Sequence, residues 1–587
     1  MIVSFRKIYC SCSVLSLVGL ILSIIAAQPS SSAFAEPSKE TSRPNILLIV
    51  ADDIGFSDIA ALGSEIPTPN LDSLAKDGKI FTNWHVLPTC SPTRSEILTG
   101  VDSHLNGLAT MYEAITPNQK GKPGYETYLN DKVITIADIL KDAGYHTIMS
   151  GKWHLSKIGK PENGTYLSDP SSRGFEEAYT FLEGWGNHFS AKLLRGKFDS
   201  NFLKNGKPVD RPNGTYSSDL FTSELINSIS KFQRDDKPLF MYLAFQATHT
   251  PLQAPPSLIK KYLGKYDAGW DAIRKQRFER QKEQGIWPEK LQLPERFPPI
   301  PKWSSIAPTQ QKYWSKVMAT FAAMVDNMDY NIGKLIYYLK QTGDYNNTLI
   351  VFTSDNGGSE VLHGPAEGFN NTYANIGNPT SLIGYNETGS AVAVSPLSGF
   401  KGSMYEGGIR SPLIIKEPRG FIGSSSLDRP ISNQKPIQSF VHVLDMLPTI
   451  LDYAGVSFPG SVYTGKDIYV PTIGNSIRPL LEGRLQKLHA NDQPIAQELF
   501  GNSAVFMGEW KAMRHIQPAG NGMWELYNIM EDPGEKNNLA KKNLDVLRKM
   551  ISAYDKYTKD FVVIPPDPKA FPAGLYGTLV NIYSQRN

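Results

Sequence analysis

The segment of residues 87–100 contains the side chains with the clearest chemical potential in this chain. It places Cys90, Pro92 and Arg94 in a Cys-x-Pro-x-Arg arrangement, followed by Leu98-Thr99-Gly100. Pro92 suits the first position of a helix, and Gly100 suits its end. Cys90 would then lie at a helix N-terminus, where anions are favoured, with Arg94 one turn further on. This local pattern predicts either a buried structural cysteine or a nucleophile beside an anion site.

Polar side chains also follow four apolar runs, at residues 45–50, 145–149, 238–245 and 348–353. Continuous apolar runs with helices between them are typical of a parallel α/β sheet. Ligands bind beyond the carboxyl ends of the strands in such sheets, so the polar residues should meet at one edge. These residues are Asp52, Asp53, Lys152, His154, His249, Asp355 and Asn356. Lys401, which precedes the turn at Glu406-Gly407-Gly408, completes the set.

The acidic members of this set predict a metal site. Asp52, Asp53, Asp355 and Asn356 offer hard oxygen ligands and no sulfur or imidazole. Such ligands select Ca²⁺ or Mg²⁺ over zinc. Ca²⁺ is favoured because it tolerates irregular geometry and several carboxylates.

Two segments resemble the signatures of type I sulfatases, and of bacterial arylsulfatases most closely. They are Cys90-Ser91-Pro92-Thr93-Arg94 with Leu98-Thr99-Gly100, and residues 144–154, from Gly144 to His154. The resemblance extends from about residue 43 to about residue 540. It implies an alkaline-phosphatase-like fold, a large mixed and mostly parallel sheet sandwiched by helices. It also implies that a formylglycine-generating enzyme oxidises Cys90 to formylglycine (3-oxoalanine).

The same resemblance assigns roles to individual residues. Asp52, Asp53, Asp355 and Asn356 would bind one calcium ion, with the modified Cys90 completing the site. Lys152 and Lys401 would hold the sulfate oxygens and Arg94 the attacking oxygen. His249, helped by Lys401, would protonate the leaving alcohol, and His154 would accept a proton as sulfate is released. The implied activity is hydrolysis of a small sulfate ester, an aryl sulfate giving a phenol and inorganic sulfate.

Composition and charge are those of a globular protein. Of 587 residues, 20% are charged and 41% hydrophobic, and the net charge of +3 gives no reason to expect a nucleic-acid partner. The first 35 residues predict a signal peptide, with Arg6 and Lys7, an apolar run at 14–27, and Ala33-Phe34-Ala35. We therefore expect an exported protein, periplasmic or secreted, without a membrane anchor after cleavage. An uncleaved anchor is the alternative.

The chain has three cysteines, of which Cys10 and Cys12 belong to this leader. The exported part would keep only Cys90 and could form no internal disulfide. Cys90 is then either buried and inert or no longer a cysteine.

The organisation of the remaining chain is predicted as follows. Residues 36–43 form a linker, 44–455 the catalytic α/β domain, and 456–587 a smaller C-terminal α+β domain with an antiparallel sheet. Helices are expected at 68–78, 134–143, 219–232, 315–340, 438–453 and 544–557, and further strands at 412–415, 503–507, 511–515 and 524–528. Residues 266–301 are predicted as an irregular insertion and 359–397 as a long loop near the site.

Two other functions remain open at the level of sequence. A phosphonate or phosphate ester hydrolase of the same superfamily would share the metal edge and, in some members, the cysteine motif. A non-catalytic exported calcium-binding protein would keep an inert Cys90. Aryl, alkyl and carbohydrate sulfates all remain open as substrates, and so does a direct role for His104.

Overall fold

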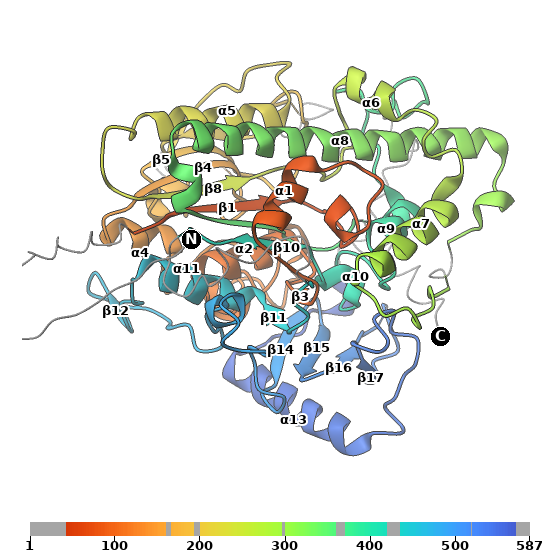
Figure 1. The fold of residues 1–587 in the computed structure, drawn as a ribbon. Helices are drawn as coiled ribbons and strands as arrows, with labels where there is room; N and C mark the ends of the chain where they lie inside the picture. The colour runs from red at the N-terminus through yellow and green to blue at the C-terminus, as the bar shows by residue number, and fades with distance from the viewer. Residues whose placement is uncertain are drawn as a thin grey trace, which may run out of the picture. The chain divides into compact units, whose positions relative to one another are not determined.

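The structure is a computed structural model that describes residues 43–159, 166–192, 200–295, 300–359, 370–419, 435–517 and 519–570 (Figure 1). Residues Arg43–Asn587 form one compact unit. The predicted signal peptide and all of the predicted linker except residue 43 lie outside the described residues. The domain boundary predicted after residue 455 stays a prediction. Within the described ranges, no helix is both long enough and apolar enough to span a bilayer.

The main sheet of the described residues has nine strands in the order β2-β10-β9-β1-β8-β4-β5-β6-β7. Its centre, from β9 to β5, is parallel, and β10, β2, β6 and β7 add antiparallel edges. The bounds are β1 (Asn45–Ala51), β2 (Lys79–Phe81), β4 (His146–Lys152), β5 (Glu177–Phe181), β6 (Phe202–Lys204), β7 (Lys207–Pro208), β8 (Leu239–Ala244), β9 (Thr348–Ser354) and β10 (Leu413–Lys416).

Both faces of this sheet are buried, as β1 illustrates. Leu47 and Ile49 pack into one hydrophobic core, whereas Leu48 and Val50 pack into another. Successive side chains of a strand point to opposite faces, so a strand with two apolar faces needs a helical layer on each side. The first core receives α1 (Pro69–Asp77), α5 (Ser217–Ser230) and α8 (Pro308–Gln341), and the second receives α2 (Cys90–Thr99), α4 (Ile136–Asp142) and α11 (Met446–Ala454). The predicted fold class is confirmed.

Three predicted segments differ from the structure. Residues 266–301 are not irregular throughout, because they contain α7 (Gly269–Glu283), which buries the polar side chains of Arg277 and Gln281 and so lacks a clear apolar period. The predicted loop 359–397 contains α9 (Asn386–Ala393), and its residues 360–369 lie outside the described residues. The helix predicted at 438–453 starts only at Met446, after β11 (Val441–His442) and a short 3-10 turn at Val443–Asp445.

A second sheet of four antiparallel strands lies near the C-terminus (Figure 1). It consists of β14 (Ile495–Leu499), β15 (Asn502–Met507), β16 (Trp510–Arg514) and β17 (Glu525–Asn528), with α13 (Leu544–Asp560) on one face. Val505, Ala512 and Leu526 pack there against Met550 and Tyr554 of the helix. The α+β character predicted for this region is confirmed, and β14 is a strand that the sequence analysis missed.

The antiparallel sheet also supports the segment that follows Lys401. Lys511 of β16 donates to Glu406 Oε1 at 2.8 Å and to Glu535 Oε1 at 2.7 Å. Glu406 begins the short helix α10 (Glu406–Ile409), and its side chain and that of Lys511 are fully buried. The backbone N–H of Met404 donates to His515 Nε2 at 3.0 Å. The C-terminal region therefore fixes a loop of the candidate site.

Candidate active site

The carboxyl ends of the parallel strands gather the predicted residues at one edge. β1 ends at Ala51, directly before Asp52 and Asp53, and β9 ends at Ser354, directly before Asp355 and Asn356. β4 ends in Lys152, two residues before His154, and His249 follows β8 by five residues. Because β8, β1 and β9 are hydrogen-bonded neighbours in parallel register, their ends meet as the sequence predicted.

Cys90 is the first residue of helix α2 and lies against this edge. Its thiol is 3.5 Å from Asp52 Oδ1, and Lys401 Nζ is 3.2 Å from its sulfur. The helix starts two residues earlier than expected, so that Pro92 is its third residue. Proline is tolerated at this position because the N–H groups of the first turn have no partner within the helix. Gly100 ends it in the left-handed conformation, φ 65°, and its N–H donates to the Glu96 carbonyl.

Each carboxylate of the cluster faces one basic side chain. Lys152 Nζ lies 2.7 Å from Asp52 Oδ2, and Lys401 Nζ lies 2.6 Å from Asp53 Oδ1. Arg94 Nε donates to Asp355 Oδ2 at 2.7 Å. The carboxylates and two of the bases are almost completely shielded from solvent, and only Lys401 is slightly exposed. The cluster is therefore a buried and highly charged region of the site, in which electrostatic interactions are strong.

Burial and these charges set the ionisation of the cluster. Burial raises the pKa of Asp52 to about 8, although Lys152 opposes the shift. Burial also acts on Asp53, but Lys401 and His249 outweigh it and hold the pKa of Asp53 well below its ordinary value. Burial and Asp355 act to raise the pKa of the Cys90 thiol, but Lys152, Lys401 and the nearby His154 outweigh them, so that this pKa is lowered on balance.

The acidic cluster fits a divalent cation. Two buried oxygens, Asp53 Oδ2 and Asn356 Oδ1, have no hydrogen-bond partner among the described residues. Asp52, Asp53, Cys90 and His249 offer ligand atoms that lie within 4.8 Å of one another. Asp53 also has φ 63°, a region that non-glycine residues rarely adopt and that is typical of functional sites. Unpaired buried oxygens are costly, and a cation at this position would satisfy them.

Two histidines border the cluster on the side that solvent reaches. His249 Nδ1 donates to the Thr250 carbonyl at 2.8 Å, which leaves Nε2 facing Asp53 Oδ2 at 3.7 Å. His154 has φ 58°, and its Nε2 lies 3.7 Å from Glu113 Oε1. Burial lowers the pKa of His154, but the interactions with Cys90 and Glu113 raise it on balance. Both histidine rings lie near the positively charged Lys152, and His249 also lies near Lys401. Such a position suits a side chain that donates or accepts a proton.

Several residues around the histidines were missed in the sequence. Glu113 lies in a 3-10 turn (Tyr112–Ala114), and His188 donates from Nε2 to the His249 carbonyl at 3.0 Å. His188 follows β5 (Glu177–Phe181). The segment 178–182, mostly aromatic and aliphatic and followed by Glu183, is the signal that could have indicated a fifth strand end at this edge.

His104 does not belong to the cluster around Cys90. Both of its ring nitrogens are engaged, by Asp102 at 3.1 Å and by Glu498 of β14 at 2.8 Å. Its position indicates a structural role that joins helix α3 (Ser103–Asn106) to the antiparallel sheet.

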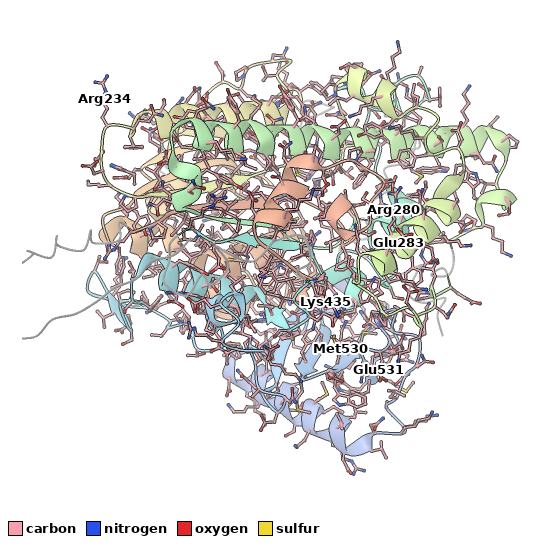
Figure 2. All side chains as sticks on the ribbon, viewed as in Figure 1. Arg234, Arg280, Glu283, Lys435, Met530 and Glu531 are labelled. Atoms are coloured by element: carbon pink, nitrogen blue, oxygen red, sulfur yellow. The ribbon has the colours of Figure 1, made fainter. Side chains whose placement is uncertain are left out.

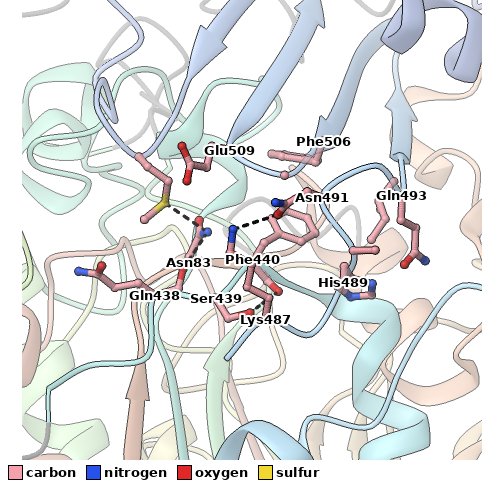
Figure 3. Close-up of a pocket in the computed structure, with 14 residues that line it drawn as sticks. Asn83, Gln438, Ser439, Phe440, Lys487, His489, Asn491, Gln493, Phe506 and Glu509 are labelled. Carbon is pink, nitrogen blue, oxygen red and sulfur yellow. Dashed lines mark hydrogen bonds between the residues drawn. The ribbon is translucent and has the colours of Figure 1, made fainter. Parts of the chain in front are cut away.

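A separate cavity lies where this sheet meets the α/β region (Figure 3). Its wall includes Phe440, His489 and Phe506, together with Asn83, whose amide donates to Met530 Sδ. None of the predicted catalytic residues lines it. The cavity is therefore distinct from the cluster around Cys90.

Comparison with known proteins gives one consistent result. The family model described as Sulfatase matches residues 44–456, more than half of the chain. An uncharacterized sulfatase of Schizosaccharomyces pombe is 38% identical over 562 residues, which cover 92% of this chain and 98% of that protein. The arylsulfatase of Klebsiella aerogenes is 35% identical over 466 residues, 76% of this chain and 94% of that enzyme.

The fold is shared with solved structures as well. Ps i-CgsB, solved in complex with k-i-k-neocarrahexaose, has a TM-score of 0.60 at 26% identity and covers 92% of this chain and 98% of its own. Similarity over nearly the whole chain, with the signature cysteine at the edge where the acids and lysines converge, leads to one conclusion: this chain belongs to the type I sulfatases, a family of sulfuric ester hydrolases.

Proposed function

We propose that the protein hydrolyses aryl sulfate esters with the help of a calcium ion and a formylglycine made from Cys90. The observation that carries this proposal is the position of Cys90, within 3.5 Å of both Asp52 and Lys401 at the start of helix α2. The preference for aryl substrates is supported by the Klebsiella relative, which is named an arylsulfatase. Other relatives are named for sugar sulfates, such as an N-acetylglucosamine-6-O-sulfatase of Bacteroides thetaiotaomicron at 25% identity.

The metal would be held by Asp52, Asp53, Asp355 and Asn356, with an oxygen of the modified residue 90. Their oxygens suit one Ca²⁺, and the two unpartnered ones, on Asp53 and Asn356, are the most direct support. A divalent cation there would supply positive charge that offsets the charge of the sulfate oxygens and favours ionisation of a nearby hydroxyl.

The modified side chain, as a hydrated aldehyde, would supply the attacking hydroxyl and a second hydroxyl through which sulfate is released. Lys152 and Lys401 face this position and can bind the sulfate oxygens. Arg94 keeps one buried nitrogen, Nη2, without a hydrogen-bond partner among the described residues, so it can donate to an added oxygen. His249 would protonate the leaving oxygen, and His154 would accept the proton during sulfate release.

Maturation and location form part of this proposal. A formylglycine-generating enzyme would modify Cys90, and the predicted leader at residues 1–35 would direct the chain to the periplasm or the medium. The mature enzyme would then act on a small sulfate ester outside the cytoplasm.

Mass spectrometry of the peptide that contains residue 90 tests the proposal. We expect a mass about 18 Da below that of cysteine, as thiol-to-aldehyde conversion of a nucleophile requires. The same preparation should hydrolyse a chromogenic aryl sulfate, and Cys90→Ala should remove that activity while leaving the circular dichroism spectrum unchanged. An unmodified thiol in fully active enzyme would refute the mechanism, and hydrolysis of phosphonates in preference to sulfates would favour the alternative hydrolase class.

A further inference from the structure

The imidazole of His154 packs closely against the backbone of Gly184. A Cβ added to Gly184 would come within 2.4 Å of its Cε1, 2.6 Å of its Nε2 and 3.0 Å of its Nδ1. One face of the ring therefore lies directly against the backbone of Gly184, which only glycine permits. The ring could still flip by a half-turn about its Cβ–Cγ bond, so this contact alone does not decide which nitrogen faces residue 90.

Glu113 supplies the missing constraint. Its carboxylate lies at the Nε2 end of the ring, with Oε1 3.7 Å from Nε2, and Glu113 itself lies in the 3-10 turn Tyr112–Ala114. Its second oxygen, Oε2, is buried without a hydrogen-bond partner among the described residues. Burial raises the pKa of Glu113, but His154 outweighs it and the net value is about 2, so the carboxylate is charged at neutral pH.

We propose that Glu113 is a positioning residue that holds His154 with Nε2 protonated and leaves Nδ1 as the base toward residue 90. This inference rests on the proposed function. His154 Nδ1 is buried and has no hydrogen-bond partner within the described part of the chain, as expected for a nitrogen reserved for a group that is added there. A carboxylate that fixes the tautomer of a histidine base is a recurring solution in hydrolases.

Glu183 provides a matched control for charge. It precedes Gly184, and its negative charge also acts on His154. Its carboxylate, however, accepts hydrogen bonds from the backbone and the side chain of Asn201 and is not paired with the ring. Glu183→Gln therefore removes a nearby charge without removing the contact that Glu113 makes.

The expected kinetic effect is confined to one half of the reaction. His154 accepts its proton after the alcohol has left, while the bond between residue 90 and the sulfate oxygen breaks and the aldehyde is restored. Since kcat/KM reports only steps up to departure of the alcohol, Glu113→Gln should leave it unchanged and lower kcat. General acid–base catalysis contributes about 10²–10⁴-fold, so misorientation of the base should cost kcat about ten- to hundredfold.

Steady-state and rapid-mixing kinetics with an aryl sulfate measure this split. In Glu113→Gln we expect a fast first release of phenol, one per active site, followed by slow turnover. Glu183→Gln should stay within about twofold of the wild type in both constants, since it lacks the contact that fixes the base. In a His154→Ala background, Glu113→Gln should have no further effect.

A second readout does not depend on turnover. The protein has ten histidines, and ¹⁵N-histidine labelling, with His154→Ala to assign the signal, reports which nitrogen carries the proton. At a pH above the raised pKa of His154, where the ring is neutral, we expect the Nε2–H form in the wild type and in Glu183→Gln, and a mixture of tautomers in Glu113→Gln. The proposal would be overturned if Glu113→Gln left the tautomer of His154 unchanged, or if it lowered kcat and kcat/KM equally. It would also be overturned if Glu183→Gln had the same effect as Glu113→Gln. If the wild type hydrolyses no sulfate ester, the proposed function fails, and the spectra alone decide the role of Glu113.

Discussion

Replacement of Arg277 tests how the loop behind the acidic pair is supported. Arg277 lies on α7 and its side chain is completely buried. Glu283, which is labelled on the same helix in Figure 2, is exposed. Arg277 Nη1 lies 2.6 Å from Asp58 Oδ1, and its Nε and Nη2 lie 2.7 and 2.9 Å from the oxygens of Glu65. Asp58 follows the Asp52-Asp53 pair and accepts from the N–H of Gly55 at 2.9 Å.

The structure gives the size of the effect of Arg277→Met. Without the guanidinium, Asp58 would keep only the Gly55 N–H, while its side chain is 0% exposed. Glu65 is less affected, because it is 13% exposed and retains the Tyr266 hydroxyl at 2.9 Å. Breaking a buried ion pair by removing one partner costs about 3–5 kcal/mol. We expect a loss near the lower end, about 3 kcal/mol, since only Asp58 remains unpaired.

Urea unfolding, monitored by tryptophan fluorescence, measures this loss as a lower urea concentration at the midpoint, with an unchanged dependence of the free energy of unfolding on urea. Asp58→Asn is the matched background, because it removes the charge that Arg277 neutralises. In that background Arg277→Met should cost at least about 1 kcal/mol less than in the wild type. A loss below about 1 kcal/mol in the wild type, or the same loss in both backgrounds, would refute the account of a buried charge left unpaired.

The remaining predictions concern the metal and pH. Calcium at a hundred times its dissociation constant should stabilise the folded protein by about 2.7 kcal/mol, so chelation of calcium should lower the melting temperature. Asp53→Asn is the control, because adding calcium should leave the melting temperature of this variant unchanged. Burial lowers the pKa of His104, but Asp102 and Glu498 outweigh it and raise the value to about 10. Because the folded state then binds the proton more tightly than the unfolded state, with a value of 6.5, this stabilisation is complete below about pH 6.5 and is lost as the pH rises toward 10. His104→Gln should flatten the stability curve between these limits, and an unchanged slope would contradict the assigned ion pairs.

The sequence was most informative where local chemistry and a simple topological rule act together. Apolar runs without alternation indicate strands buried on both faces, and parallel strands place their carboxyl ends at one edge. These two rules were enough to bring Asp52, Lys152, His249 and Asp355 into one site. The position of Cys90 at a helix start also followed from local signals, although the helix begins two residues earlier than Pro92 suggested.

The sequence was less informative where polar side chains are buried. Helix α7 was missed because the face it buries includes Arg277 and Gln281, so its apolar period is weak. β14 and β5 are strands of only five residues, and each contains polar residues that weaken its apolar pattern. For α7, contacts with residues far along the chain decide which polar side chains are buried, and a local pattern cannot report them.

By itself, the sequence determined the types of the reacting groups, the parallel sheet that gathers them and the family to which the chain belongs. Only the tertiary structure decided which base faces which acid: Lys152 with Asp52, Lys401 with Asp53 and Arg94 with Asp355. It also brought Glu113 to the ring of His154 from a turn with no motif of its own. The physical reason is that strand ends are positioned by backbone hydrogen bonds, whereas pairing of buried charges depends on the packing of segments that are 261 and 348 residues apart in the sequence.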